Sequence, residues 1–238
     1  MNIAIIGYGR MGHEIEAIAI ERGHKIVLTI DNNNQHDLSK ENLANVDVAI
    51  EFTTPATAFE NVKTCLNAGI PIVCGTTGWI DKLQEAKALA EKSDGALFFA
   101  SNYSIGVNLF FRINNLIAKY IEKVKGFDVS IEETHHTQKK DAPSGTAITL
   151  AEIVSKEISS LKGWTLLPET EEGKIPIEAI REENVTGNHT VFYNSDQDEI
   201  VLTHRAKSRR GFALGAVLAA EYSKGKTGFL TMDSFLKL

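Results

Sequence analysis

The stretch Asn2–Gly12, NIAIIGYGRMG, decides the fold of this chain. A short apolar run leads directly into a G-x-G-x-x-G pattern, and apolar residues at helical spacing, such as Ile15 and Ile18, follow it. Between a strand and a helix, such glycines permit a tight turn, close approach of a pyrophosphate and tight helix–strand packing. The start of the helix directs amide donors and a positive dipole at the phosphates. The stretch therefore predicts a dinucleotide site formed by Gly7, Tyr8, Gly9, Arg10, Met11 and Gly12.

Asp31 stands at the end of the next apolar run, Lys25–Ile30. An acid about 20 residues past the glycines binds the adenosine ribose 2′-hydroxyl in such sites. Its carboxylate would repel a 2′-phosphate, and Asn32–Gln35 contribute no cation to offset that repulsion. We therefore expect NADH to be used at least as well as NADPH. The competing interpretation is a glycine-rich turn with Asp31 as a structural cap.

The first hundred residues alternate short apolar runs with helical patterns. Strands separated by helices indicate βαβ units and a parallel sheet with helices on both faces. Gly23 and Gly69 each fall just past a helix, where a left-handed cap is usual. We expect an α/β domain with a Rossmann-type doubly wound sheet. Its strands are expected at Ile3–Ile6, Lys25–Ile30, Val46–Phe52, Ile70–Val73 and Ala96–Ala100, and its helices at Met11–Arg22, Ala56–Ala68 and Asp81–Lys92.

The pattern changes near Asn102, because later strand-like runs follow one another without helices between them. This favours an inserted α+β domain with a mostly antiparallel sheet. We expect one domain over residues 1–104 and 211–238 and the inserted one over 105–210. The elements expected here are helices at Val107–Val124, Pro143–Ser160 and Phe212–Lys224, and strands at Phe127–Glu133, Ile175–Arg181, His189–Tyr193 and Glu199–Arg205.

Two more loops follow expected strands, at Gly75–Gly78 and Ala100–Tyr103. In open α/β sheets, ligands bind in the crevice beyond the carboxyl ends of the strands. Glycine, threonine, asparagine and serine also favour turns without any ligand, so the residue types leave both interpretations open. The candidates for the nicotinamide end are Gly75, Thr76, Thr77, Ala100, Ser101, Asn102 and Tyr103.

The segment Glu132–Ala147, EETHHTQKKDAPSGTA, concentrates groups that move protons and bind anions. A histidine exchanges its proton near neutral pH, as a general acid must. Pro143–Thr146 begin a helix with Asp141 or Ser144 as its cap, and a glycine there lets a carboxylate reach free amide groups. The segment therefore indicates a carboxylate cradle beside a proton donor.

Simpler interpretations compete with this one. A pair of histidines is often exposed loop polarity, and Lys139–Lys140 alone is typical of solvated surface. A metal on His135, His136 and Glu133 is not expected, because adjacent histidines converge poorly and no further ligand has matching spacing. A second basic run, His204–Arg210, could bind phosphate or carboxylate, contact RNA or be solvated. Its place at the return to the first domain favours an interdomain role.

Composition excludes several classes of protein. The 238 residues are 43% hydrophobic and 24% charged, with a net charge of −6, which argues against disorder and against a nucleic-acid binder. The two cysteines, Cys65 and Cys74, support neither a disulfide framework nor a zinc pattern. The opening apolar run is too short for a signal peptide, and no segment approaches the roughly 18 apolar residues of a membrane helix. We expect a cytoplasmic protein with no membrane partner.

The chain resembles the dihydrodipicolinate (4-hydroxy-tetrahydrodipicolinate) reductase family of bacterial diaminopimelate and lysine biosynthesis. The shared motifs run over nearly the whole chain in family order, and HHTQKKDAPSGTA at His135–Ala147 is highly specific. The other motifs are GYGRMG at Gly7–Gly12, EFTTP at Glu51–Pro55, GTTG at Gly75–Gly78, NYSIGVN at Asn102–Asn108, GNHT at Gly187–Thr190 and THRAKSR at Thr203–Arg209.

The resemblance implies a tetrameric enzyme that reduces an unsaturated dicarboxylate heterocycle with NADH or NADPH. His135 would be the general acid, and Lys139 a second proton donor that also contacts substrate. His136, Gly145 and Thr146 would hold substrate carboxylates. Hydride would reach the conjugated ring carbon, and a proton would quench the charge that develops at the ring nitrogen or the enamine carbon. The inserted domain would bind substrate and form the tetramer.

The sequence departs from the family pattern at a few positions. Thr54 stands where many members have arginine, Asn188 replaces a glutamate, and the glycine-rich loop is shorter than in some members. Asp31 lacks the following arginine of members that use both cofactors, which supports the leaning to NADH. The alternatives are another small Rossmann-type imine or amino-acid dehydrogenase, and an NAD(H)-binding regulator without activity.

Overall fold

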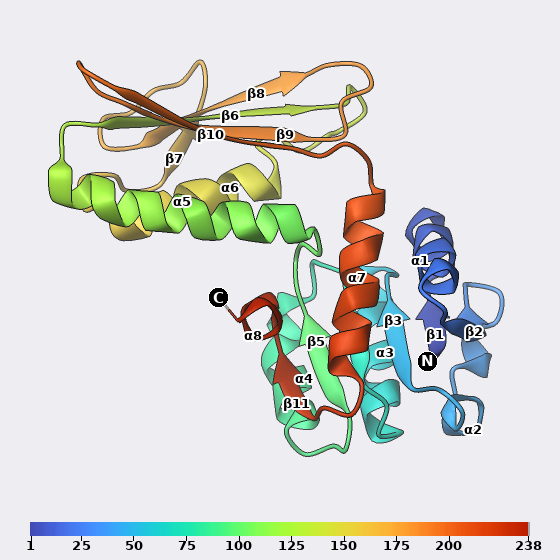
Figure 1. Cartoon of the computed structure of the whole chain (residues 1–238). Coiled ribbons are helices and arrows are strands. Elements are labelled where there is room, and N and C mark those ends of the chain that lie inside the picture. The colour runs from blue at the N-terminus through green and yellow to red at the C-terminus, as the bar shows by residue number, and fades with distance from the viewer. Residues whose placement is uncertain (238) are drawn as a thin grey trace. The chain divides into compact units, whose positions relative to one another are not determined.

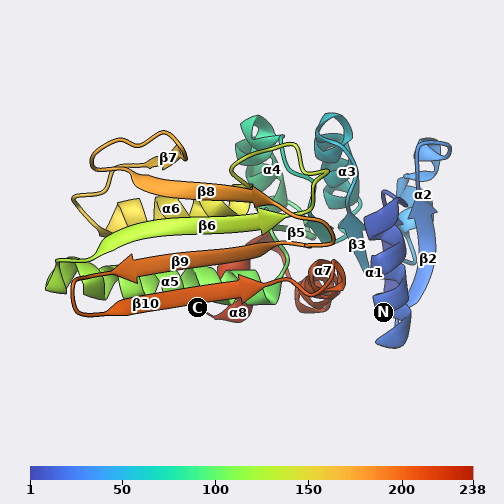
Figure 2. The same cartoon turned by 90° about the horizontal axis from the view of Figure 1, so that it is seen from above.

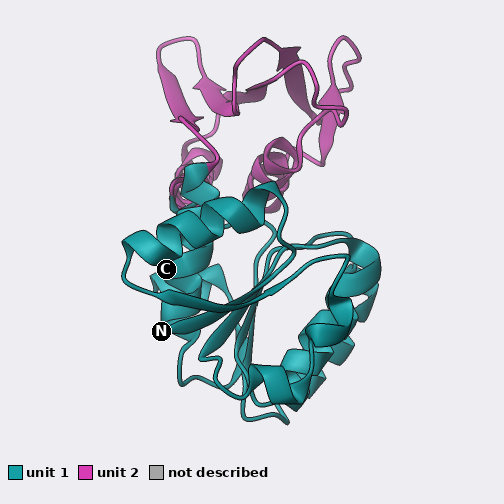
Figure 3. Cartoon of the chain, turned by 90° about the vertical axis from the view of Figure 1, so that its right-hand side faces the viewer, with its two compact units in different colours: residues 1–105, 210–238 teal, residues 106–209 magenta. Residues whose placement is uncertain are grey.

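The computed structural model describes residues 1–237, which divide into two compact units. One unit holds residues 1–105 and 210–237, and the other holds residues 106–209 (Figure 3). Each boundary lies one residue from the position expected from the sequence. The second unit is thus a continuous insertion into the first, between the strand that ends at Phe99 and the helix that begins at Arg210 (Figure 1).

The first unit is built on a six-stranded sheet in the order β11-β5-β4-β3-β1-β2, and all its neighbouring strands are parallel. The chain order reverses between β1 and β3, which is where ligands bind in open sheets of this type. The Rossmann-type doubly wound sheet is therefore confirmed. Its strands are β1 (Asn2–Ile6), β2 (Lys25–Ile30), β3 (Val48–Glu51), β4 (Ile72–Cys74), β5 (Ala96–Phe99) and β11 (Gly228–Leu230).

Helices cover both faces of this sheet (Figure 3). In β1, Ile3 and Ile5 face a core shared with α1 and α7, whereas Ala4 and Ile6 face a core shared with α2, α3 and α4. Burial on both faces explains why the strands read as continuous apolar runs. The helices are α1 (Arg10–Glu21), α2 (Lys40–Leu43), α3 (Pro55–Asn67), α4 (Leu83–Ala90), α7 (Arg210–Ser223) and α8 (Met232–Leu236), with single 3₁₀ turns at Gln35–Asp37 and Ile80–Lys82.

Local sequence signals set several helix ends. Gly23 and Gly69 have φ values of +80° and +75°, so the left-handed caps predicted after α1 and α3 are confirmed. Pro55 is the first residue of α3, where its missing amide costs no helical hydrogen bond. The expected elements did not include α2, β11 or α8. Each has only three to five residues, which is too short for a periodic pattern.

The second unit packs two helices against a five-stranded sheet in the order β10-β9-β6-β8-β7. Two of its pairings are antiparallel and two are parallel, so the sheet is mixed rather than mostly antiparallel. Helix α6 lies between β6 and β8 in the chain, and such a crossover returns the next strand parallel. The elements are α5 (Ile105–Val124), β6 (Asp128–His135), α6 (Gly145–Glu157), β7 (Trp164–Leu166), β8 (Ile175–Arg181), β9 (Asn188–Asn194) and β10 (Glu199–Arg205).

Both helices of this unit lie on the same face of its sheet (Figure 2). Val191 and Tyr193 of β9 belong to the core beneath the helices, whereas Phe192 alternates to the other face. Strand β6 continues through His135, two residues past the expected end at Glu133. Helix α6 is shorter than Pro143–Ser160, and Ser144 rather than Asp141 caps it. Among residues 1–237, no helix is both long and apolar enough to cross a bilayer.

Candidate active site

The glycine-rich turn after β1 is shaped by contacts that only glycine allows. Gly7 has a φ of +96°, and a Cβ on it would lie 2.0 Å from the carbonyl oxygen of Phe52. A Cβ on Gly12, in the first turn of α1, would lie 2.4 Å from the Gly7 oxygen. Around Gly9, in contrast, no protein atom lies within 4 Å of the place a Cβ would occupy. Two glycines therefore close the turn, and the third leaves open space beside the backbone.

That open space adjoins the start of α1. Gly9 is the residue before the helix, and no side chain forms a cap hydrogen bond there. The first amides of a helix lack intrahelical acceptors, and the helix dipole favours an anion beside them. A helix start that has no side-chain cap and open space beside Gly9 fits a pyrophosphate. Arg10, the first residue of the helix, is exposed, and Tyr8 bonds Glu16 through its hydroxyl.

Asp31 follows β2 at the same edge of the sheet, with its side chain exposed. Its backbone amide donates to the Asn34 side chain at 2.7 Å, and its carbonyl accepts from the Asn34 amide at 3.1 Å. Asp31 therefore takes part in this turn through its own backbone amide and carbonyl, and its carboxylate faces solvent. This is the geometry that a contact to ribose hydroxyls requires.

The loops after β4 and β5 each contain exposed and buried side chains. Thr77 and Ser101 are exposed, whereas Thr76 and Tyr103 are buried. The Tyr103 hydroxyl donates to the carbonyl of Cys74 at 2.8 Å, and its ring packs in the core. Burial raises the pKa of this hydroxyl well above its usual value. Neither buried side chain is free for a ligand, so a cofactor contact at Thr76 or Tyr103 would have to use backbone atoms.

Glu51, at the end of β3, is a fully buried carboxylate that links the loop after β3 to the loop after β4. It accepts from the Thr76 hydroxyl and from the Thr53 amide, both at 3.0 Å, and from the Cys74 thiol at 2.9 Å. The Thr53 amide also donates to the Thr76 hydroxyl at 2.8 Å. Buried polar networks of this kind fix loop geometry when all their members are paired. Glu51 therefore sets the shape of the turn that carries Thr76.

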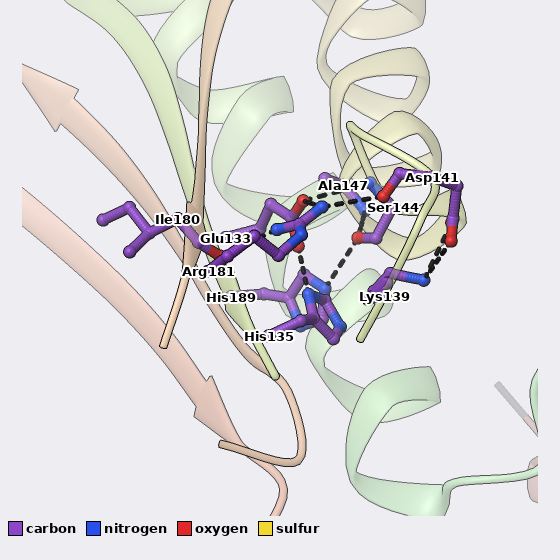
Figure 4. A network of polar contacts seen from close by, with 9 residues as sticks. All are labelled: Glu133, His135, Lys139, Asp141, Ser144, Ala147, Ile180, Arg181 and His189. Carbon is purple, nitrogen blue, oxygen red and sulfur yellow. Dashed lines mark hydrogen bonds and ion pairs between the residues drawn. The ribbon is translucent and has the colours of Figure 1, made fainter. Parts of the chain in front are cut away.

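In the second unit, a polar network surrounds the end of β6 (Figure 4). His135, the last residue of the strand, contacts Glu133 through Nδ1. The other carboxylate oxygen of Glu133 accepts from Arg181 Nη2 at 3.0 Å and from the Ser144 amide at 3.3 Å. Glu133 is fully buried and His135 is nearly so. One carboxylate thus joins the candidate proton donor to β8 and to the start of α6.

The start of α6 is the anion-binding feature expected from the sequence. The Ser144 side chain accepts from the Ala147 amide at 3.3 Å and contacts His189 Nε2 at 3.1 Å. Gly145 is exposed, and no protein atom lies within 4 Å of the place a Cβ would occupy on it. Thr146 is half-buried. At the start of this 13-residue helix, Gly145 is therefore the position at which an anion can approach the backbone amides that Ser144 does not cap.

Lys139 lies in the loop between β6 and α6 and points toward Asp141 (Figure 4). Its Nζ is 2.8 and 2.9 Å from the two carboxylate oxygens of Asp141. This hydrogen bond lowers the pKa of Asp141. Arg181 Nη2 also donates to the Asp141 carbonyl at 2.7 Å. The lysine loop is thereby fastened to the same arginine that holds Glu133.

Two buried members of the network, His189 and Glu133, differ in their charge near pH 7. Burial lowers the pKa of His189 to about 3, and the nearby charge of His135 adds to that effect, so His189 is neutral near pH 7. Burial alone would raise the pKa of Glu133, but hydrogen bonds from His135 and Arg181 outweigh it and lower the pKa. The carboxylate is therefore ionised, and its charge is balanced by Arg181.

Glu133, His135 and His189 also meet the geometric condition for a metal site, with one ligand atom each within 4.8 Å of the others. This set differs from the adjacent histidines considered from the sequence. Glu133 is already paired with Arg181, and Ser144 contacts one nitrogen of His189. Arg181 thus already balances the charge of the Glu133 carboxylate.

The basic run His204–Arg210 has three separate environments. His204 stacks on Phe110 with ring centroids 6.0 Å apart, and burial lowers its pKa. Arg210 pairs with Glu21 of α1. Lys207–Arg209 line an open groove of about 630 Å³ in the second unit, together with His136–Gln138 and Glu183–Thr186. His136 therefore faces a groove with two further cations.

Comparison with known proteins covers almost the whole chain. The family model described as dihydrodipicolinate reductase, N-terminus, matches residues 1–103, and the one described as dihydrodipicolinate reductase, C-terminus, matches residues 106–236. The chain belongs to the dihydrodipicolinate reductase family. A relative named 4-hydroxy-tetrahydrodipicolinate reductase from Christiangramia forsetii is 53% identical over 99% of this chain and 98% of its own length. One of that name from Archaeoglobus fulgidus is 37% identical over all of both chains.

Solved structures agree with this assignment. A dipicolinate-bound dihydrodipicolinate reductase from Paenisporosarcina sp. TG-14 superposes with a TM-score of 0.81 and 26% identity over 98% of each chain. An amine dehydrogenase from Mycobacterium smegmatis has a TM-score of 0.63 at 11% identity, over 96% of this chain and 94% of its own, and shares the fold alone. The family to which this chain belongs consists of reductases that use pyridine nucleotides.

For this reductase family member, sequence reasoning missed the residues that surround His135. Glu133 was considered only as a metal ligand, and the roles of Arg181 and His189 beside it were not predicted. Arg181 and His189 lie on β8 and β9, more than 40 residues further along the chain, so local spacing could not bring them to His135. Strand alternation could have found Glu133, because residues two apart on a strand share a face.

Proposed function

We propose that the protein reduces 4-hydroxy-tetrahydrodipicolinate to tetrahydrodipicolinate with NADH or NADPH, as a step of diaminopimelate and L-lysine biosynthesis. The observation that carries this proposal is that Glu133 joins His135 to the start of α6, in a chain that matches the reductase family over residues 1–103 and 106–236. The dipicolinate bound by the Paenisporosarcina reductase supports a small dicarboxylate as substrate.

The roles proposed for the second unit follow from charge and accessibility. Gly145 and Thr146 bind one substrate carboxylate through the first amides of α6, and His136 contributes a further contact. His135 donates the proton that quenches charge on the reduced ring. Lys139 is a second proton donor and a substrate contact. Its ammonium group lies 2.8 Å from Asp141, so substrate carboxylate and Asp141 compete for it.

The roles proposed for the first unit concern the cofactor, which supplies hydride when bound. The start of α1 at Gly9 and Arg10 faces the pyrophosphate, Asp31 binds the adenosine ribose, and the loops at Gly75–Thr77 and Ala100–Tyr103 hold the nicotinamide end. Because the Asp31 carboxylate has no cation among Asn32–Gln35, NADH is favoured over NADPH. No metal takes part.

We further propose that the protein is a cytoplasmic homotetramer and that its second unit forms the subunit contacts. The support is the sheet face opposite α5 and α6, which no helix of that unit covers in the described chain (Figure 2). Phe192 is half-buried on this face, and Val201, its partner in register on β10, is 45% exposed. Apolar residues on an open face are typical of association surfaces.

The test is the rate of NADH and NADPH oxidation with the condensation product of pyruvate and aspartate semialdehyde, measured in parallel with simple imino acids. We expect turnover with the condensation product alone and a kcat/KM with NADH at least equal to that with NADPH. Turnover with imino acids alone would assign the protein to the other class of dehydrogenase. Nucleotide binding without any turnover would make it a regulator, and a large NADPH preference would refute the role of Asp31.

A further inference from the structure

Glu133 is placed by the fold against three elements at once. It lies two residues before His135 on β6, so both side chains project from the same face of the sheet. Register places Arg181 of β8 beside His135 and His189 of β9 beside Glu133. Ser144, at the start of α6, donates its amide to the carboxylate at 3.3 Å. Four segments of chain thus converge on this one buried side chain (Figure 4).

The two oxygens of the Glu133 carboxylate are used differently. Oε1 accepts from Arg181 Nη2 at 3.0 Å and from the Ser144 amide, which keeps the group ionised and fixes its plane. Oε2 is left for His135 Nδ1. Since an ionised carboxylate only accepts hydrogen bonds, Nδ1 must carry a hydrogen in this contact. The neutral imidazole is therefore held with its hydrogen on Nδ1.

A side chain at Gly187 would crowd the opposite nitrogen of His135. A Cβ built on Gly187 would lie 2.9 Å from His135 Nε2 and 3.2 Å from the adjacent Cδ2. Glycine at this position therefore keeps the side of the ring that carries Nε2, opposite Glu133, free of a side chain from residue 187. Nε2 is then the nitrogen that gains and loses the exchangeable proton, whereas Nδ1 stays bonded to the carboxylate.

We propose that Glu133, itself held by Arg181, is a positioning residue that fixes His135 in the tautomer with Nδ1–H and so directs Nε2 to the substrate. This inference rests on the proposed reductase function, because it assumes that His135 is the proton donor. It differs from that proposal in assigning a role to a side chain that is fully buried and touches no substrate. Removal of its charge is expected to act on proton transfer and not on binding.

The experiment compares Glu133→Gln with Glu132→Gln. Glutamine keeps the size of the side chain, but its NH₂ group can donate to Nδ1 and so favour the tautomer with hydrogen on Nε2. We expect kcat of E133Q to fall by about 10²- to 10⁴-fold, the range for a general acid held in the wrong tautomer. KM and the dissociation constant for NADH should stay within about threefold. Glu132 is half-buried on the opposite face of β6, so E132Q loses the same charge and should keep wild-type turnover.

A second readout does not depend on substrate. Imidazole ¹⁵N shifts at about pH 9, where an ordinary histidine is neutral, distinguish the two tautomers. We expect Nδ1–H at His135 in the wild type and Nε2–H in E133Q, with the His135 signal assigned from a His135→Gln sample. Glu133→Asp, which keeps the charge, should recover part of the turnover lost in E133Q.

Three results would overturn the inference: an Nε2–H tautomer in the wild-type protein, an E133Q enzyme within about threefold of wild-type kcat, or an equal loss in E132Q. The wild-type spectrum decides the matter even if E133Q fails to fold. If the wild type shows the Nδ1–H tautomer but no turnover of the condensation product, the proposed function fails and the Glu133–His135 arrangement stands.

Discussion

His189 is a buried imidazole that cannot accept a proton without loss of stability. It lies 5.0 Å from the ring of His135, is almost fully buried, and has Ser144 as its hydrogen-bond partner. A second positive charge here would face the imidazolium that His135 forms when it is protonated. His189 is therefore the member of this pair of imidazoles that stays neutral near pH 7.

This gives a pH-dependence with a definite sign. The pKa of His189 is about 3 in the folded protein and 6.5 in the unfolded chain, so protons favour unfolding. The stabilising contribution is complete above pH 6.5 and is lost as the pH falls toward 3, by at most about 1.4 kcal/mol per pH unit. We expect wild-type protein to lose more stability than His189→Gln between pH 7.5 and pH 4.5, by about 2–3 kcal/mol.

The measurement is urea unfolding followed by the fluorescence of Trp164, which lies in the second unit, in a Trp79→Phe background. Glutamine can still contact Ser144 through its amide, so the comparison isolates the titrating group. Parallel pH-dependence in the two proteins would show that His189 gains no charge on unfolding and would contradict this account of the network.

Among the elements, β6 shows best why the sequence revealed part of the structure and not the rest. Val129 and Ile131 alternate as expected of a strand with one buried face, and the expected range ended at Glu133. The inward positions that follow the isoleucine are Glu133 and His135, which break the apolar pattern although the strand continues. Polar side chains thus occupy core positions of this strand, which is where pattern-based reasoning is expected to fail.

The long elements of the first unit were predictable because burial and glycine signals agree there. Strands β1 to β5, helices α1, α3 and α4, and the glycine-rich turn at Gly7–Gly12 all follow from apolar runs with turn residues between them. The parallel pairing of β6 with β8 was not predictable from local pattern, since it depends on the crossover through α6. The partners of His135 were hidden for the same reason, because register with β8 and β9 brings them together.

Two glycines at the start of α1, Gly9 and Gly12, can be compared by replacing each with alanine. Gly9→Ala places a methyl group in open space at an extended backbone, whereas Gly12→Ala places one 2.4 Å from the Gly7 oxygen. We expect G9A to keep the unfolding midpoint and to bind NADH at least about tenfold more weakly, because the methyl occupies the phosphate approach. G12A should lose about 1–3 kcal/mol of stability through overpacking.

Thermal unfolding and NADH fluorescence titration separate the two effects. Equal losses of stability in both variants would show that the space beside Gly9 is needed for folding. Wild-type affinity for NADH in G9A would show that the pyrophosphate does not lie at this helix start.

On the scale of the whole molecule, the uncovered face of the mixed sheet provides a test of assembly. Val201 on edge strand β10 and Val27 on edge strand β2 are both 45% exposed, and they belong to different units. We expect the wild type to have four times the chain mass of 26.1 kDa by light scattering. Val201→Lys should give smaller species, and Val27→Lys should leave the mass unchanged.

A mass change in V27K alone would indicate that the subunit contacts lie in the first unit. A wild-type monomer at the concentrations used for activity would refute the tetramer while leaving the reaction untouched, since the two assays are independent.

The insertion of the second unit also determines the order in which a ribosome can complete this protein. All residues of the second unit have been made by Arg209, whereas β5 gains its outer neighbour only when Gly228–Leu230 emerge and pair with Ala96–Phe98. Until then the nascent first unit has an unpaired strand edge, the feature that invites contact with other chains. The second unit can therefore mature first, and the first unit keeps an exposed strand edge until β11 has been made.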